Sequence, residues 1–171
     1  DRFDLAALAE QARAPGNPVL PLVQALRAAL PESAARYVHH GATSQDVLDT
    51  AAMLTSAAAL DALLTDLDAI GAAVAALAKT YRDTPMAGRT LLQHAMPVTL
   101  GLKAAGWLVA LDAAIDRLAE VRTGRLAVQL GGATGSLDGF GAAGPELVAR
   151  LASRLGLATP VLPWHTDRTR I

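Results

Sequence analysis

The sequence has 171 residues, 52% of them hydrophobic, with 15 Lys and Arg against 16 Asp and Glu, and it contains no cysteine. This apolar content suffices for one buried core, and the interleaved charges exclude a basic surface for nucleic acid or an anionic membrane. The absence of cysteine excludes disulfides, thiolate metal sites and thiol nucleophiles, and it fits a reducing compartment, so we expect a cytoplasmic protein.

Neither end of the sequence has the features of a natural terminus. The first residues, Asp1–Asp4, include no initiator Met and no signal segment, and the chain stops at Ile171 without a cap or tail signal. The most apolar run, Ala69–Ala78, is far shorter than the roughly 18 residues of a membrane span. We therefore expect a piece of a longer chain that does not cross a membrane.

The first part of the chain predicts short helices. Ala, Leu and charged residues dominate, and no stretch alternates cleanly with β-branched residues, so we expect nearly all helix and no sheet. Helices are predicted over Phe3–Ala14 and over Pro18–Leu30, where Pro18 or Pro21 suits the first turn and Pro31 ends the element.

Two long antiparallel helices are predicted next. The stretch Asp46–Thr84 has no proline and only one glycine, which gives a helix of about 55 to 60 Å. Its apolar residues recur at steps of three and four, the seam of a left-handed bundle, namely Leu60, Leu63, Leu67, Ile70, Val74, Leu77 and Tyr81. A loop containing Pro85, Gly88 and Pro97 leads to the second helix, Val98–Val128, with the same spacing at Leu108, Leu111, Ile115 and Leu118.

The last part of the chain predicts a turn and one more helix. The run Leu130–Ser136 is a glycine-rich turn, and Pro145 begins a helix that Gly156 ends. We see no internal repeat, low-complexity tract or linker.

The first segment with chemical potential is Tyr37–Asp46, directly before the longest predicted helix. Thr43 or Ser44 can cap that helix while Asp46 returns a bond to its open N–H groups. The same hydroxyls and N–H groups, at the positive end of the helix dipole, can instead bind a substrate carboxylate. The residues alone leave both interpretations open.

The second segment, Pro85–Gly101, places Arg, Thr, Gln and His between the two long helices. Such side chains need partners if they are buried, and a polar loop exposed to water is the alternative. His94 alone fits a hydrogen-bonded interhelical histidine as well as a catalyst. The third segment, Pro163–Arg170, would by itself be an ordinary surface turn.

Taken together, these segments resemble the signature regions of the fumarase/aspartase superfamily. His39–Asp46 (HHGATSQD) is similar to the first region, and Gly88–Gly101 (GRTLLQHAMPVTLG) is similar to the second. The continuation Gly101–Trp107, with Gly131–Gly135 and Pro163–Thr166, resembles the cycloisomerase branch most. The resemblance covers essentially the whole chain.

The resemblance implies an all-α, long-helix bundle of the L-aspartase-like type, truncated at both ends. Residues 1–171 would form a single helical piece, comprising part of the N-terminal region and the start of the central bundle. Other members carry a third signature, a loop that supplies the proposed serine base; this sequence has nothing like it, which implies that the loop lies beyond Ile171 and that the piece alone is inactive. The family forms homotetramers whose active sites collect the regions from different subunits.

The resemblance also favours lactone formation over amine elimination. In adenylosuccinate lyases a histidine after Gly-Arg-Thr is thought to protonate the departing amine, but here that position is Leu91. Losing a general acid costs such a lyase a factor of about 10² to 10⁴. A cycloisomerase acting on a carboxylated muconate has no such need, because its nucleophile is a carboxylate with an ordinary pKa of about 4.

The resemblance assigns substrate-binding roles to two groups of residues. Thr43 and Ser44 would bind a substrate carboxylate, with His39 lining the same pocket. The second group would contact or orient a small dicarboxylate or tricarboxylate, namely Arg89, Thr90 and Gln93. His94 is a catalytic candidate without a fixed role, and the roles of His40 and His165 stay open. Relatives usually show Gln-Arg-Asp-Arg where this chain reads Asp167–Arg170, so no role is carried over to Asp167.

No cofactor and no metal are expected. His39 and His40 are adjacent and point apart on most backbones, and no carboxylate completes a ligand set at helical spacing. Two alternatives to the cycloisomerase remain: an adenylosuccinate-lyase-like enzyme, and a non-catalytic helical assembly module in which Thr43 and Ser44 only cap a helix, worth about 1 kcal/mol.

Overall fold

A computed structural model describes residues 3–171, and these residues form two compact units. The first unit combines the chain up to Ser56 with Arg125–Ile171, and the second is Ala57–Gly124. Helix α4 (Ser44–Thr80) contributes its first turns to one unit and the remainder to the other.

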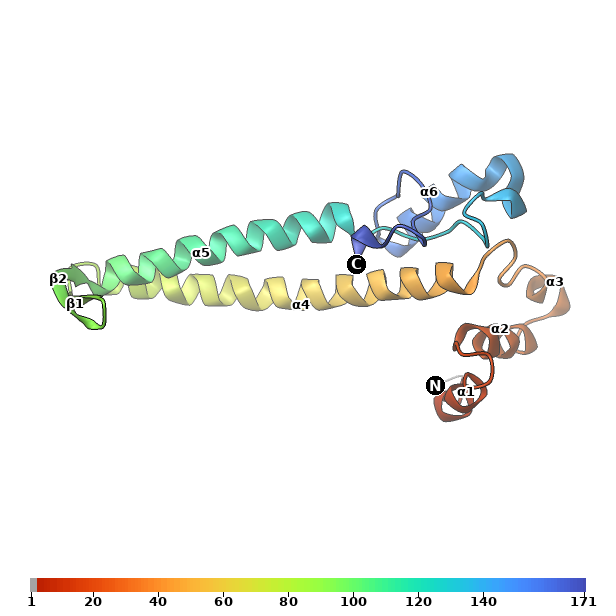
Figure 1. Cartoon of the computed structure of the whole chain (residues 1–171), viewed down its shortest axis with the longest axis horizontal. Helices are drawn as coiled ribbons and strands as arrows, with labels where there is room; N and C mark the ends of the chain where they lie inside the picture. The colour runs from red at the N-terminus through yellow and green to blue at the C-terminus, as the bar shows by residue number, and fades with distance from the viewer. Residues whose placement is uncertain (1–2) are drawn as a thin grey trace. The chain divides into compact units, whose positions relative to one another are not determined.

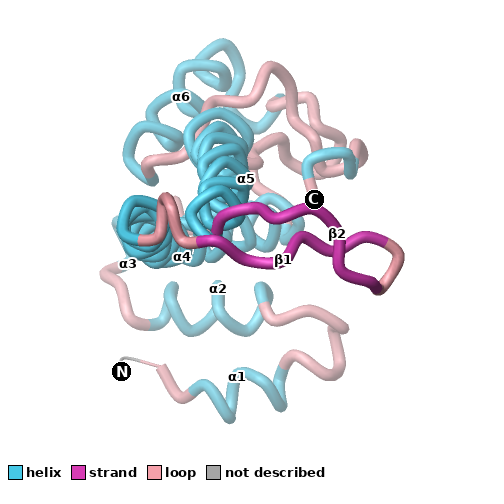
Figure 2. The backbone as a smooth tube through the Cα atoms, turned by 90° about the vertical axis from the view of Figure 1, so that its left-hand side faces the viewer, coloured by secondary structure: helices cyan, strands magenta, loops and turns pink. Residues whose placement is uncertain are grey.

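The second unit is a helical hairpin. Figures 1 and 2 both show α5 (Leu100–Glu120) running alongside the later part of α4, as the spacing of apolar residues predicts. The helices meet closely at Gly71, where an added Cβ would lie 4.0 Å from Leu108 Cδ1. At the start of α5, the N–H of Gly101 donates to the carbonyl of Tyr81 at 2.8 Å, and a Cβ there would lie 2.5 Å from Arg82 Cα. Glycine therefore permits the two helices to join this tightly.

The connection between these helices is an antiparallel β-hairpin, so the prediction of a loop without any sheet was wrong here. Strand β1 (Pro85–Thr90) pairs with β2 (Gln93–Thr99), with a register shift at Gly88. A Cβ on Gly88 would collide with the carbonyl oxygen of Met96, which explains why this bulge needs glycine. The fold class is otherwise confirmed as all-α.

Part of the predicted seam on α4 is uncovered in the single chain. Leu63 and Ile70 remain 44% and 48% exposed, and Trp107 and Val109 of α5 are 46% and 69% exposed. Two helices can bury only one stripe of each other, so the apolar residues on their other faces have no cover within this unit.

Helix α5 ends earlier than the predicted Val128. It stops at Glu120 and is followed by a π-helical turn, Val121–Arg125. The hydroxyl of Thr123 donates to the carbonyl of Ala119 at 2.8 Å, a back-bond that competes with regular helix geometry. The apolar run that follows is therefore free to become extended.

The first unit contains the shorter helices. They are α1 (Leu5–Gln11), α2 (Val19–Ala28), α3 (Glu32–Ala35), the start of α4, and α6 (Gly144–Leu155), with short 3-10 turns at Asp138–Ala143 and Arg168–Arg170. Pro145 and the left-handed Gly156 bound α6 as predicted. The extended run Leu126–Leu130 is buried at the centre, and Ala127 forms a parallel bridge with Ala158.

Within residues 3–171, no helix combines the length and the apolar character needed to cross a membrane.

An ion pair fastens the π-helical turn to α4 in the second unit. Arg122 donates to both carboxylate oxygens of Asp61, at 2.7 and 3.0 Å, and this hydrogen bonding lowers the pKa of Asp61 below its ordinary value. A lowered pKa in the folded state adds stability above the unfolded-state pKa, and that stability disappears as the pH falls through the folded-state pKa.

We therefore expect Asp61→Asn to be less stable than the natural chain at neutral pH and equally stable once the pH falls below the pKa of Asp61. Urea denaturation of both proteins across this range is the measurement, with the exposed Asp68→Asn on the same helix as the control. A stability difference that persists unchanged in acid would contradict the electrostatic origin of the effect.

Candidate active site

The N-terminus of α4 carries the first group of predicted site residues. Thr43 and Ser44 are half-buried, and the N–H of Thr43 donates to Asp46 Oδ2 at 2.9 Å. The predicted return bond from Asp46 is thus confirmed. Across residues 3–171, no hydrogen bond reaches the hydroxyl of either Thr43 or Ser44, so these hydroxyls do not cap the helix.

The Asp46 carboxylate binds the helix start to the glycine-rich turn. It is 2% exposed, and its Oδ1 accepts from Gln129 Nε2 at 2.9 Å and from the N–H of Gly131 at 3.0 Å. Its Oδ2 accepts from the N–H of Gly132 at 3.0 Å in addition to that of Thr43. Four N–H donors therefore satisfy a buried carboxylate, as buried charge requires.

Glycines allow the two backbones to approach at this point. Gly132 has φ +74°, and a Cβ there would lie 2.8 Å from the carbonyl oxygen of Gly41. A Cβ on Gly139 would lie 2.7 Å from Gly41 Cα. The backbone at Gly41 consequently packs directly against the backbone of Gly132 and of Gly139.

Gln129 is the centre of the first unit's polar network. It is 1% exposed, its backbone N–H donates to Thr50 Oγ1 at 2.9 Å, and its carbonyl accepts from the same hydroxyl at 3.0 Å. Its Oε1 accepts from the N–H of Trp164 at 2.6 Å, and its Nε2 lies 3.2 Å from Nδ1 of His165. One side chain thus joins α4, the central extended run and the C-terminal segment.

A second buried carboxylate, Asp49, lies one turn further along α4. Arg168 donates to both of its oxygens, at 2.7 and 3.0 Å, and these bonds raise the pKa of Arg168 above its ordinary value. Gln45 Nε2 donates to the same carboxylate at 2.8 Å. Asp167, in contrast, accepts from the N–H of Thr169, which lowers the pKa of Asp167 and caps a local turn.

A largely apolar cavity of about 700 Å³ borders this network. His39 and His40 line it together with apolar side chains of α2, α4 and α6, and the ring of His40 meets Phe140 edge-on at 6.3 Å. His39 has φ 60°, a conformation that costs energy for a residue with a side chain. The structure therefore holds His39 at the cavity wall against its intrinsic preference.

The second group of predicted site residues lies on the hairpin of the second unit. The β-register places Arg89 opposite His94 and Thr90 opposite Gln93, next to the turn, and all four are exposed. Leu91 and Leu92 form the turn with φ 49° and 63°, and their exposed fractions are 92% and 103%. A two-residue turn with both φ values positive normally carries Asn or Gly, so this apolar tip is strained.

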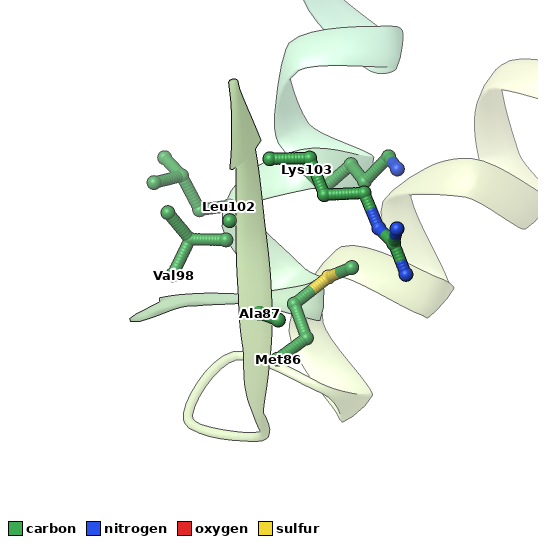
Figure 3. A pocket seen from close by; sticks show the side chains of 7 residues that line it. Met86, Ala87, Val98, Leu102 and Lys103 are labelled. Carbon is green, nitrogen blue, oxygen red and sulfur yellow. The ribbon is translucent and has the colours of Figure 1, made fainter. Parts of the chain in front are cut away.

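A smaller cavity of about 360 Å³ lies at the base of the hairpin (Figure 3). Met86 and Val98 of the two strands line it with Leu102 and Lys103 of α5, and Arg89 completes a lining with two cationic side chains. The predicted site residues thus form two groups, one at the start of α4 and one on the hairpin, which belong to different units. Their roles in binding stay predictions.

No cluster of three or more His, Asp or Glu side chains within residues 3–171 is arranged to hold a metal ion.

Comparison with known families decides what kind of protein carries these features. A family model described as "Lyase" matches residues 16–170. The chain belongs to this lyase family, within the fumarase/aspartase superfamily. The resemblance to this superfamily is thereby confirmed.

Individual relatives show which members of the lyase family this chain is similar to. It is 51% identical, over 99% of its length, to a 3-carboxy-cis,cis-muconate cycloisomerase of Bradyrhizobium diazoefficiens, and 48% identical over its full length to a nitrosuccinate lyase of Streptomyces davaonensis. The solved 3-carboxy-cis,cis-muconate lactonizing enzyme of Pseudomonas putida superposes with a TM-score of 0.91 at 46% identity, over 99% of this chain and 39% of that one. The chain spans about 38% of the length of both curated relatives.

Several residues of the polar network were missed from the sequence of this lyase chain. Gln129 and Asp49 carry most of its hydrogen bonds, yet no short-range pattern marks them, and the role of His165 was left open. The only local signal is an amide in the middle of the apolar run Leu126–Leu130, which requires buried partners.

We expect Asp46→Asn to destabilise the folded chain by about 3 kcal/mol, because an amide nitrogen would face backbone N–H donors that need an acceptor. Denaturant unfolding measures this change. The exposed Asp68→Asn on the same helix is the matched control and should stay within about 0.5 kcal/mol of the natural protein. Equal effects of the two substitutions would show that the four N–H bonds do not hold the first unit together.

Proposed function

We propose that the intact protein converts 3-carboxy-cis,cis-muconate to its lactone, 4-carboxymuconolactone, in aromatic catabolism. Three features support this proposal: membership of the lyase family, the similarity to cycloisomerases named for this substrate, and the side chain at the hairpin tip. The side chain at the hairpin tip, Leu91, is the main argument for the reaction type.

The proposed reaction is an internal addition that needs no cofactor. A carboxylate oxygen of the substrate forms a C–O bond to one carbon of a C=C bond. The π electrons move to the neighbouring carbon, where an adjacent carboxylate stabilises the developing charge, and one proton then adds to that carbon. The lactone therefore contains all the atoms of the ionised substrate plus this one proton. It carries one negative charge fewer, because the attacking carboxylate has become part of an ester.

Leu91 is the observation that favours this chemistry over amine elimination. It occupies the tip of the hairpin between Thr90 and the Gln93–His94 pair, and it carries no titratable proton. A departing amine requires protonation, whereas a carboxylate adds to or leaves from carbon in its ionised form. An apolar tip beside polar groups suits a reaction that needs anion binding and water exclusion more than proton transfer at this position.

The proposed binding roles follow the two groups on the structure. Thr43 and Ser44 present hydroxyls that have no intramolecular partner within residues 3–171, at the positive end of the α4 dipole, where a carboxylate binds well. His39 lines the adjoining cavity. On the hairpin, Arg89, Thr90 and Gln93 offer donors to the remaining carboxylates, and His94 stands opposite Arg89 as their polar neighbour.

We also propose that the intact protein is a homotetramer whose active sites combine groups from different copies. The support is physical: the outward faces of α4 and α5 leave Leu63, Ile70 and Val109 between 44% and 69% exposed. In addition, Leu91 and Leu92 hold a strained turn in full contact with water, an arrangement that becomes favourable when another surface covers them. A cysteine-free chain fits the cytoplasm as the location.

One other function has a specific observation behind it. The 48% identity to a nitrosuccinate lyase extends over the full chain, so elimination of a small anion from a substituted succinate is the second candidate. Such an anion leaves without first being protonated as an amine must be, so Leu91 is compatible with this reaction as well. Both candidates share a substrate with several carboxylates.

The substrate is tested with the intact protein. We expect loss of 3-carboxy-cis,cis-muconate absorbance with a kcat/KM at least tenfold above that for release of nitrite from nitrosuccinate, and no cleavage of adenylosuccinate. Light scattering of the same preparation should give the mass of four chains. A preference for nitrosuccinate would establish the second candidate, and activity on adenylosuccinate alone would refute the argument from Leu91.

We expect Thr43→Val and Ser44→Ala in the intact enzyme to reduce turnover roughly 10² to 10³-fold, the usual effect of removing a preorganised donor. Their stability should change by less than about 1 kcal/mol, because neither hydroxyl caps α4. Thr55→Val is the matched control, since the Thr55 hydroxyl only bonds the carbonyl of Ala51 on the same helix. Full activity in both variants would support a purely structural role for this helix start.

A further inference from the structure

The orientation of the Gln129 side-chain amide is fixed by its neighbours. Its Oε1 faces the backbone N–H of Trp164 at 2.6 Å, and a backbone N–H can only donate. Its Nε2 faces Asp46 Oδ1 at 2.9 Å, and that carboxylate already accepts three backbone N–H groups. Exchanging the amide oxygen and nitrogen would place donor against donor at Trp164 and acceptor against acceptor at Asp46.

This orientation determines the tautomer of His165. The second hydrogen of Gln129 Nε2 points to Nδ1 of His165, at 3.2 Å. Because Nε2 of Gln129 is a donor, Nδ1 of His165 must be an acceptor, and the neutral ring then carries its proton on its own Nε2. The buried Asp46 carboxylate thus fixes the imidazole tautomer through one amide.

The imidazole ring is also fixed in position. An added Cβ at Gly135, which has φ +78°, would lie 3.1 Å from Cε1 of His165, so the glycine-rich turn lies directly against the ring edge. The backbone carbonyl of His165 accepts from Arg168 Nη1 at 3.4 Å, and Arg168 is itself held by Asp49, so the backbone that carries the ring is also tied down. With Nδ1 turned inward to Gln129, the Nε2–H lies on the opposite edge of the ring, and His165 is partly exposed.

We propose that His165 is a substrate-contacting residue whose Nε2–H is a permanent hydrogen-bond donor to a carboxylate oxygen of the substrate, and not a base. The proposal rests on the proposed function and adds a residue that none of the signature regions assigns. Two hydrogen bonds, through Gln129, connect the ring to Asp46, which lies in the first turn of α4 two residues after Ser44. Within residues 3–171 the Nε2–H has no partner of its own.

Three roles for His165 predict different behaviour of two substitutions in the intact enzyme. In His165→Asn, the side-chain oxygen can take the place of Nδ1 and accept from Gln129, but the outer donor is lost. In His165→Gln, the amide reaches the distance of Nε2, so a donor remains at the outer position while the inner acceptor is lost. The two variants therefore separate the two edges of the ring.

If His165 donates to substrate, His165→Asn keeps its thermal midpoint but loses roughly ten- to hundredfold in kcat/KM, mostly through KM. His165→Gln then recovers most of that loss despite a lower thermal midpoint. A purely structural residue would give the reverse pattern, with a fully active Asn variant. An acid or base would give two variants with kcat reduced to the same extent and KM unchanged. Either of these last two results overturns the proposal.

The tautomer has a readout that does not depend on activity. In the intact protein labelled with ¹⁵N-histidine, long-range ¹H–¹⁵N correlation should show Nδ1 of His165 as the bare nitrogen and Nε2 as the protonated one, with the signal assigned by its absence in His165→Asn. A protonated Nδ1 would overturn the proposal even in an active enzyme. If the protein shows the expected tautomer but is inactive on all three substrates named above, the proposed function is refuted and the tautomer assignment stands.

Discussion

The first unit depends on one buried carboxylate. Asp46 lies in the first turn of α4, where open N–H groups already favour a negative charge, and it accepts four hydrogen bonds from groups far apart in the sequence. A neutral amide in its place would turn a donor toward these N–H groups, and the carboxylate that accepts from them is 2% exposed. The start of the longest helix, the glycine-rich turn and the central extended run are therefore positioned by the same pair of oxygens, and Thr43 and Ser44, the first group of residues proposed to bind substrate, lie at that helix start.

The helical framework could be predicted from the sequence because its signals are local. Pro145 and Gly156 mark α6 by backbone restrictions alone, and the spacing of apolar residues marks α4 and α5. The hairpin gave no such signal, because most residues of its strands are exposed and the strands contain Pro85 and Pro97. The early end of α5 was also missed, although Gly124 lies in the π-helical turn Val121–Arg125 that follows the helix.

The polar network could not be predicted for a different reason. The bonds from Gln129 and Gly131 to Asp46 join residues 83 and 85 positions apart, and the bond from Arg168 to Asp49 spans 119 positions. No periodicity or capping rule connects such distances. The expectation that Asp46 bonds to an open N–H was correct, but it described only one of its four partners. From the sequence, Asp46 was therefore interpreted as an ordinary helix cap and not as the centre of the first unit.

Two positions in the structure both lack a proton that they could donate. At the hairpin tip, Leu91 carries no titratable proton, and in the first unit the amide of Gln129 prevents Nδ1 of His165 from carrying one. The first position therefore carries an apolar side chain, and the second presents a hydrogen-bond donor. An enzyme that adds an already ionised carboxylate to a double bond needs such groups, since the large term is stabilising charge on the substrate's carboxylates and only one proton has to reach carbon. The strained turn at Leu91 and Leu92 and the fixed tautomer of His165 therefore both fit the proposed lactonisation. That reaction needs a preorganised binding site for anions and few groups that exchange protons.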